Sequence, residues 1–160
     1  MKTQIETPQG FFTAYFSENG LAGLDFPAAK KMANKTDGTK LPSVVRQWEK
    51  TTAAALRAVL AGKEPKALPP LDFSAGTPFQ QSVWRELLKI GSGQTKSYGE
   101  IANLIGRSRA VRAVGGACGA NPIPVLVPCH RVLAANRKLG GFSGGLERKI
   151  SLLAAEGVAV

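Results

Sequence analysis

Short apolar runs rich in aromatic residues, separated by turn signals, fill the first 26 residues. The turn signals are Thr7-Pro8-Gln9-Gly10 and Glu18-Asn19-Gly20, and the runs between and after them are residues 11–16 and 21–26. Turns of this composition between such runs are typical of hairpins. The pattern predicts a small antiparallel β-meander.

The pattern changes after Pro27, which stops the second run. Residues 27–41 are rich in lysine and predict a loop. From Ser43, which suits an N-cap, apolar residues recur at helical spacing until Gly62, a helix stop. The recurring residues are Val44, Val45, Trp48, Leu56, Val59 and Leu60. We expect an amphipathic helix here, and we expect the aromatic residues of this first part to lie in a core.

Residues 64–76 contain three prolines and only a short apolar piece, residues 71–73. Such a segment is typical of a linker or of an edge strand at a boundary. It divides the chain into a structural N-terminal domain with linker, residues 1–76, and a second domain, residues 77–160.

Capping boxes open two helices in the second part. Thr77-Pro78-Phe79-Gln80 and Ser97-Tyr98-Gly99-Glu100 both have the required spacing, and proline suits the first helical position. Ser108 suits the N-cap of a third helix over residues 109–119, which ends before Asn121-Pro122. The apolar residues expected to face inward are Phe79, Val83, Trp84, Leu87, Leu88, Ile101, Leu104 and Ile105.

The last two of these helices are short and joined by a tight turn at Gly106, which fits a helix-turn-helix or an ordinary helical hairpin. The second of them carries adjacent glycines, Gly115 and Gly116, each costing about 1 kcal/mol inside a helix. Small residues on one side with a projecting arginine would suit a narrow groove such as the DNA minor groove. The small residues are Ala110, Ala113 and Gly115, and the arginine is Arg112. Close helix-helix packing is the competing explanation.

The elements together predict an α+β fold. A small N-terminal antiparallel meander with one helix is followed by a mostly helical C-terminal domain that contains the possible helix-turn-helix. With 160 residues, 44% of them hydrophobic, the chain can bury a substantial core.

Charge is concentrated in the second part. The chain has 21 basic and 11 acidic residues and a net charge of +10; 11 of the basic and 4 of the acidic residues follow Gly76. From Ser97 to Gly145 the only acid is Glu100. This field suits a polyanionic partner, although charge can also serve only solubility.

Two cysteines and one histidine exclude a disulfide framework and a four-ligand zinc site. There is no apolar run long enough to span a membrane and no signal-peptide pattern at the start of the chain. We therefore expect a soluble intracellular protein with reduced thiols, without a metal ion or a cofactor.

The only histidine, His130, follows Cys129 directly after a rigid stretch, Asn121-Pro122-Ile123-Pro124-Val125-Leu126-Val127-Pro128. A thiolate is the reactive form of cysteine, and a histidine can take up its proton. Neighbouring side chains on a strand point to opposite faces, so cooperation requires a turn or a bridging water, and Pro128 favours a break. A buried cysteine beside a strand-capping histidine is the alternative.

Beyond this motif we expect a strand over residues 132–134 and a donor-rich loop over residues 140–145. A last helix follows over residues 146–156, with Leu146, Ile150 and Leu153 at helical spacing. Glu156 would end that helix, where its carboxylate opposes the helix dipole. His130 or an arginine is a candidate partner; a solvated glutamate is the alternative.

The segment Asn-Pro-x-Pro followed by Pro-Cys-His-Arg-Val resembles the active-site signature of the O6-alkylguanine-DNA alkyltransferases, or methylated-DNA–protein-cysteine methyltransferases. The resemblance runs from about Gly76 to Gly157. It implies DNA repair by stoichiometric transfer of an alkyl group from O6 of guanine, and also from O4 of thymine, to Cys129. It implies a monomer acting on double-stranded DNA, in the cytoplasm, or at the nucleoid if the source is bacterial.

The resemblance also implies residue roles. His130 would act as the base through a bridging water, Glu156 would orient it, and Asn121 would fix the surrounding backbone. Arg112 would replace the damaged base in the stack, and Tyr98 would push the 3′ phosphate and donate to guanine N3. The remaining DNA contacts would be Ala110, Ala113, Gly115 and Arg131, and the base pocket would consist of Tyr98, Val132, Phe142 and Ser143.

Two departures from the family pattern stand out. Phe142 replaces a frequent tyrosine, which removes a possible donor, and Ile90-Gly91-Ser92 replaces a more usual Ile-Pro-Tyr turn. A DNA-binding module that flags lesions without repairing them is the alternative function, and a cysteine hydrolase is a third. Cys118 has no histidine beside it in sequence, and we expect transfer to be independent of it.

Overall fold

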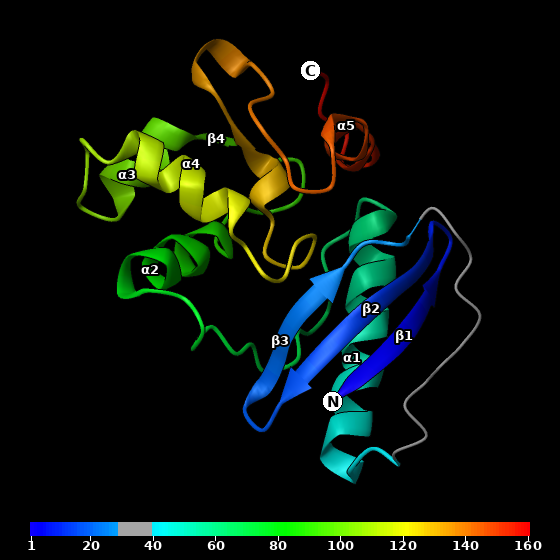
Figure 1. The fold of residues 1–160 in the computed structure, drawn as a ribbon. Coiled ribbons are helices and arrows are strands. Elements are labelled where there is room, and N and C mark those ends of the chain that lie inside the picture. Colours follow the sequence, from blue (N-terminus) through cyan, green and yellow to red (C-terminus); the bar gives the residue numbers. More distant parts are fainter. Residues whose placement is uncertain (29–39) are drawn as a thin grey trace.

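The computed structural model describes residues 1–28 and 40–160. Most of the predicted lysine-rich loop, residues 29–39, lies outside the described residues. The fold is α+β, as predicted, with a small sheet and one long helix in the first part and shorter helices in the second (Figure 1).

The predicted meander is confirmed. Strands β1 (Lys2–Thr7), β2 (Gly10–Ser17) and β3 (Gly20–Asp25) form an antiparallel sheet in the order β1-β2-β3. Alternate side chains of β2 point inward: Phe12, Ala14 and Phe16 are buried, whereas Phe11 and Tyr15 are exposed.

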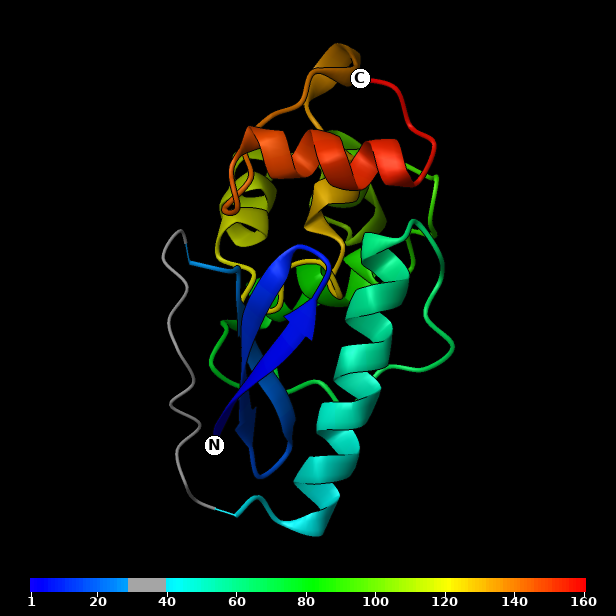
Figure 2. The same cartoon turned by 90° about the vertical axis from the view of Figure 1, so that its right-hand side faces the viewer.

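Helix α1 (Ser43–Leu60) lies along the sheet (Figure 2) and buries Val45, Leu56 and Val59. Two expectations about its start were wrong. Ser43 is the first helical residue and Pro42 takes the cap position, and Val44 is 52% exposed. The helix ends as predicted before Gly62, whose φ of +78° and close approach to the Ala155 carbonyl both require glycine.

The proline-rich boundary segment forms one bridge and no strand. Leu71 lies beside Leu21 at the edge of β3; Leu21 N donates to Pro70 O at 2.7 Å, and Asp72 N donates to Leu21 O at 2.8 Å. The segment is thus a linker that covers part of the sheet edge.

Three helices follow: α2 (Pro78–Leu87), α3 (Tyr98–Leu104) and α4 (Val111–Gly119). The Thr77 capping box is complete, and Ser97 accepts from Glu100 N at 3.0 Å. Ser108 is not a cap, because α4 begins later, with Ala110 at the cap position. Leu88 and Leu104 were expected to face inward but are 36% and 55% exposed.

The C-terminal elements surround the Cys-His motif. Strands β4 (Lys96–Ser97) and β5 (Val132–Leu133) pair in parallel, and 3-10 turns cover Cys129–Arg131 and Ala135–Arg137. The last helix is α5 (Leu146–Ala155). Its predicted apolar face was right for Leu153, which is buried, and wrong for Leu146 and Ile150, which are 48% and 43% exposed. Beside Leu153, α5 buries Lys149 and Leu152.

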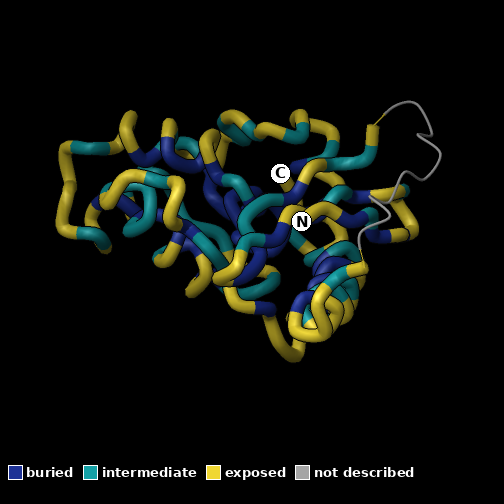
Figure 3. Tube along the Cα trace, turned by 60° about the horizontal axis from the view of Figure 1, so that its bottom comes forward, coloured by how far each residue is buried: buried dark blue, intermediate teal, exposed yellow. Residues whose placement is uncertain are grey.

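One continuous cluster of buried side chains joins the two parts of the chain, and buried positions gather in the interior of the molecule (Figure 3). It includes Phe12 and Leu56 from the first part and Trp84, Ile101 and Val127 from the second. The division into domains at Gly76 stays a prediction. In the described part of the chain, none of the helices combines the length and the apolar character needed to cross a membrane.

Candidate active site

The loop before Cys129 is held by Asn121. Its side-chain Nδ2 donates to Val127 O at 2.8 Å and its Oδ1 accepts from Ile123 N at 2.9 Å, and the asparagine is 6% exposed. Val125 within this loop has a φ of 76°, a conformation that is costly for a β-branched residue. Asn121 therefore fixes a strained backbone in the loop before the cysteine.

The backbone turns at Cys129, as the position of Pro128 predicted. Cys129 and His130 belong to a 3-10 turn in which Arg131 N donates to Pro128 O at 3.0 Å. Both side chains are buried. Cys129 and His130 are therefore not on a regular strand, where neighbouring side chains would point to opposite faces.

Glu156 follows the end of α5 and has two partners. His130 Nε2 lies 3.0 Å from Glu156 Oε1, and Arg131 donates to the same carboxylate through Nε and Nη2, the shortest of these bonds being 2.7 Å. Burial opposes ionisation of Glu156, but the hydrogen bonds from His130 and Arg131 outweigh it and lower its pKa to about 2. The carboxylate is charged at neutral pH.

This geometry corrects the expectation that Arg131 contacts DNA. Arg131 is 3% exposed, and its third donor, Nη1, binds Ile90 O at 2.6 Å. A buried carboxylate requires a charged, hydrogen-bonded partner. The fork of Arg131 fills that role and holds Glu156 in place.

His130 is suited to act as a base. Complete burial lowers its pKa below the usual value, although the bond to Glu156 opposes the shift. A neutral imidazole that donates through Nε2 to Glu156 leaves Nδ1 as a proton acceptor. Nδ1 has no hydrogen-bond partner among the described residues, so it is free to accept a proton through one water.

Cys129 depends on such a base. Burial raises the pKa of its thiol, while the hydrogen bond from Asn121 and the charge of Lys149 act in the opposite direction. The resting group is a thiol at neutral pH, and its proton must leave before the sulfur can attack.

Lys149 is a part of the site that the sequence pattern did not predict. Its side chain is completely buried on α5, and Nζ donates to Val132 O at 2.7 Å and to Gly141 O at 3.2 Å. It thereby ties the strand after the cysteine to the glycine-rich loop. Lys149, Leu152, Leu153 and Glu156 share a helical stripe, and this stripe is the signal that could have indicated the inward face.

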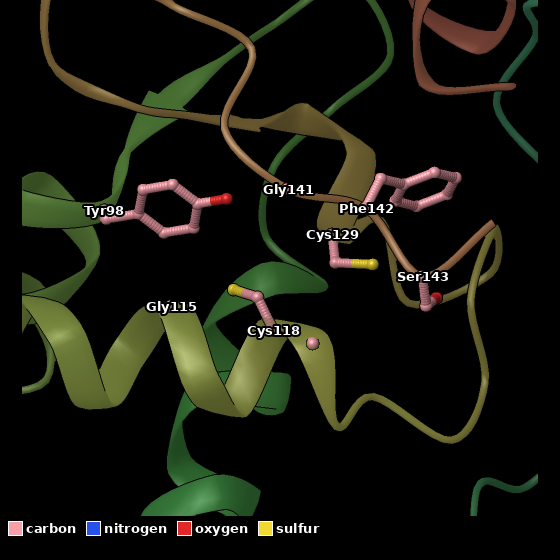
Figure 4. Close-up of a pocket in the computed structure, with 8 residues that line it drawn as sticks. Tyr98, Gly115, Cys118, Cys129, Gly141, Phe142 and Ser143 are labelled. Carbon is pink, nitrogen blue, oxygen red and sulfur yellow. The ribbon is translucent and has the colours of Figure 1, made fainter. Parts of the chain in front are cut away.

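A cavity of about 360 Å³ opens beside the cysteine. It is lined by Tyr98, Gly115, Cys118, Gly119, Cys129, Gly141, Phe142 and Ser143. In the view of Figure 4, Cys129 lies between Tyr98 and Cys118 on one side and Phe142 and Ser143 on the other. Burial raises the pKa of the Tyr98 phenol, which keeps its hydroxyl as a donor.

Two residues depart from the predicted pocket. Val132 is completely buried, does not line the cavity, and offers its carbonyl to Lys149. Cys118, in contrast, does line the cavity. Burial, with the neighbouring Cys129, raises the pKa of Cys118 to about 12, so it remains a protonated thiol.

Of the predicted groove-facing residues, Arg112 and Ala113 lie on α4 and Ala110 is its N-cap, whereas Gly115 also lines the cavity. Arg112 and Ala113 are exposed, and Ala110 and Gly115 are partly exposed. A Cβ added at Gly115, Gly116 or Gly119 would meet no atom of the described residues within 4 Å. Packing against another described helix therefore does not explain these glycines.

Comparison with known proteins identifies the family. Residues 78–158 match the family described as 6-O-methylguanine DNA methyltransferase, DNA binding domain. A methylated-DNA–protein-cysteine methyltransferase of Methanosarcina acetivorans is 39% identical over 154 residues, 96% of each chain. This chain belongs to the O6-methylguanine-DNA methyltransferase family.

Solved structures of the family share the whole fold. The Mycobacterium tuberculosis protein OGT, crystallised with DNA, aligns with a TM-score of 0.77 and 40% identity over 96% of this chain and 90% of the other. The likeness in sequence is concentrated in the second part. A curated M. tuberculosis methyltransferase is 58% identical over 81 residues, and this match spans about half the length of each protein.

Within this methyltransferase family pattern, the structure brings Tyr98, Gly115, Cys129, Phe142 and Ser143 to one cavity. His130, Glu156 and Asn121 do not line it; His130 is bonded to Glu156, and Asn121 to the Val127 carbonyl. Arg112 and Ala113 are exposed on α4, and Ala110 is its N-cap. Arg131 and Val132 instead support the site from within.

Proposed function

We propose that this protein repairs alkylated DNA by moving an alkyl group from O6 of guanine to Sγ of Cys129, one group per chain. The observation that carries the proposal is the position of Cys129. Cys129 lies on the wall of a cavity, and His130 follows it directly in the chain. His130 is buried, is bonded to Glu156 through Nε2, and has a free acceptor at Nδ1.

The reaction begins with a proton transfer. The Cys129 thiol passes its proton to His130 Nδ1 through one water, and the imidazolium that forms is stabilised by Glu156. Arg131 keeps the carboxylate oriented throughout. Without this base the raised pKa of the buried thiol would leave little thiolate at neutral pH.

The thiolate then attacks the alkyl carbon. A carbon–sulfur bond forms, the carbon–oxygen bond breaks, and its electron pair stays on the guanine. The Tyr98 hydroxyl donates to the base at N3, and Ser143 donates to O6, as negative charge develops on the leaving base. O4-alkylthymine has the same kind of alkyl–oxygen bond, and we propose it as a second substrate.

Double-stranded DNA is the proposed partner, bound by a monomer. The target atom lies inside the duplex, so the nucleotide must rotate out into the cavity while Arg112 takes its place in the stack. The small residues of α4 would let the helix approach the minor groove, and the +10 net charge favours a polyanion.

Intact-protein mass spectrometry after incubation with O6-methylguanine duplex tests the proposal. The expected product is a protein heavier by one methyl group in place of a hydrogen, with the addition on the peptide that contains Cys129. Binding of the duplex without covalent change would identify a module that only flags lesions. Turnover of a thioester or peptide substrate would identify a hydrolase.

A further inference from the structure

Phe26, the residue after β3, connects the N-terminal sheet to the cavity. Its ring centroid lies 5.6 Å from that of Phe12, a completely buried residue of β2. On its other side it lies 5.7 Å from the ring of Phe142, in an edge-to-face arrangement. Phe142 lines the cavity, and its ring also lies edge-on to that of His130, with centroids 6.5 Å apart. A row of aromatic rings thus runs from the sheet to the catalytic histidine.

The Phe26 ring also occupies the side-chain space of Gly144. A Cβ added at Gly144 would lie 2.8 Å from both Cε2 and Cζ of Phe26, and 3.0 Å from Cε1 of Phe142. Backbone conformation does not demand glycine there, because the φ of Gly144 is outside the left-handed region. The glycine is instead required by the close approach of the ring. We call residues Gly140–Gly145 the pocket loop.

Arg148 of α5 holds the ring from a further direction. Its guanidinium carbon lies 4.7 Å from the Phe26 ring centroid, and its Nη2 donates to Pro27 O at 3.2 Å. Residues of the pocket loop and of the helix after it therefore enclose one side chain of the N-terminal part. Phe142 has no polar group that a hydrogen bond could hold, so packing against Phe26 positions its ring.

We propose that Phe26 is a positioning residue for alkyl transfer. By packing against Phe142 and Gly144 it fixes the pocket loop, so that Phe142 and Ser143 face Cys129 and the reacting base is held in line with the sulfur. The inference rests on the proposed transfer to Cys129. It assigns the N-terminal part a contribution to chemistry that takes place in the second part.

The test compares two reactions of the same thiol. Transfer from free O6-benzylguanine needs the pocket loop, whereas alkylation of Cys129 by iodoacetamide needs the nucleophile and its base but no bound guanine. Phe26→Leu should slow benzyl transfer by about 10-fold or more, because small misplacements of reacting groups are costly. Its iodoacetamide rate, followed on the Cys129 peptide, should stay within about twofold of the wild type. Phe11→Leu, on the exposed face of the same sheet, is the matched control and should change neither rate.

A second pair of variants separates positioning from general destabilisation. Gly144→Ala should slow transfer strongly in the wild-type background, because the new methyl meets the Phe26 ring. In the Phe26→Leu background the same change should cost much less, since the ring is gone. All rates are measured below the onset of thermal unfolding of each variant.

Three results would overturn the inference: unchanged transfer in Phe26→Leu, an equal fall of both reactions, or additive effects of Phe26→Leu and Gly144→Ala. A wild-type protein that reacts with iodoacetamide but takes no methyl group from O6-methylguanine duplex DNA would refute the proposed function itself, and the inference with it. Transfer by the wild type with any of the three results refutes the inference alone.

Discussion

His130 Nε2 and Glu156 Oε1 lie 3.0 Å apart, and neither side chain is exposed to solvent. Arg131 binds the same carboxylate, so its charge is already compensated when the imidazole is neutral. The pair can therefore rest as neutral histidine and charged glutamate, which leaves the histidine able to accept the thiol proton. This arrangement has consequences that can be measured.

The first measurable consequence is that the stability of the protein depends on pH. The pKa of His130 is lower in the folded protein than its ordinary 6.5, so the unfolded chain takes up the proton first. Stability is fully present above pH 6.5 and should fall, by at most about 1.4 kcal/mol per pH unit, as the pH drops towards the folded pKa. Glu156 should add a second loss between pH 4.5 and about 2. Urea unfolding across this range measures both.

His130→Gln should remove the decline that begins at pH 6.5 and leave the more acidic one, since the chain has no other histidine. An unchanged profile in His130→Gln would mean that His130 is not held neutral.

His130→Ala and Glu156→Ala should each slow transfer greatly, and the double variant should be little worse than the poorer single one.

Arg131→Lys tests the corrected role of Arg131. Lysine keeps the charge but loses the forked hydrogen bonds to Glu156, and we expect a loss of about 1–3 kcal/mol in stability with slower transfer. Arg131→Gln, which removes the charge, should leave the salt dependence of DNA binding unchanged. Arg109→Gln, in the exposed turn before α4, should in contrast reduce the logarithmic salt slope by about one. A reduced slope in Arg131→Gln would show that Arg131 contacts DNA after all.

Lys149→Met should leave the carbonyls of Val132 and Gly141 without their donor. The Val132 carbonyl is buried, and a buried acceptor left unsatisfied costs about 1–3 kcal/mol; the pocket loop should also lose its attachment to β5. We expect a lower melting temperature and slower benzyl transfer. Lys89→Met, at an exposed position of the α2 end, is the control. Equal behaviour of the two variants would contradict a structural role for Lys149.

Arg112→Ala separates duplex from free-base substrates. Only the duplex needs a residue to replace the extruded base, so repair of O6-methylguanine in duplex DNA should fall much more than transfer from free O6-benzylguanine. Rates on the two substrates, with Arg85→Ala as an exposed control on α2, measure the difference. Equal losses would remove Arg112 from that role.

The elements that the sequence predicted correctly depend on local rules. The Thr77 capping box, the meander turns and the break at Pro128 need only neighbouring residues. Ser43 and Ser108 failed as caps because the helices start at a different residue, and a serine alone does not decide the first helical residue.

The sequence predicted those residues of the site that belong to the family motif. Cys129, His130 and Glu156 carry the family signature, whereas Arg131 and Lys149 are charged residues buried by contacts with distant carbonyls and carboxylates. Leu146 and Ile150 have helical spacing but face solvent, because Lys149 reaches Val132 and Gly141 from the opposite stripe. Such contacts depend on the tertiary fold and leave little local signal.

Stoichiometry tests the central claim most directly. Transfer to sulfur forms a thioether, which lacks the leaving group of a thioester, and the raised pKa of Cys118 leaves it a poor second acceptor. With O6-methylguanine duplex in excess, repaired lesions should reach a plateau at one per protein chain. Cys118→Ala should reach the same plateau, and Cys129→Ser should repair none. Continued repair past one lesion per chain, or repair by Cys129→Ser, would contradict the account.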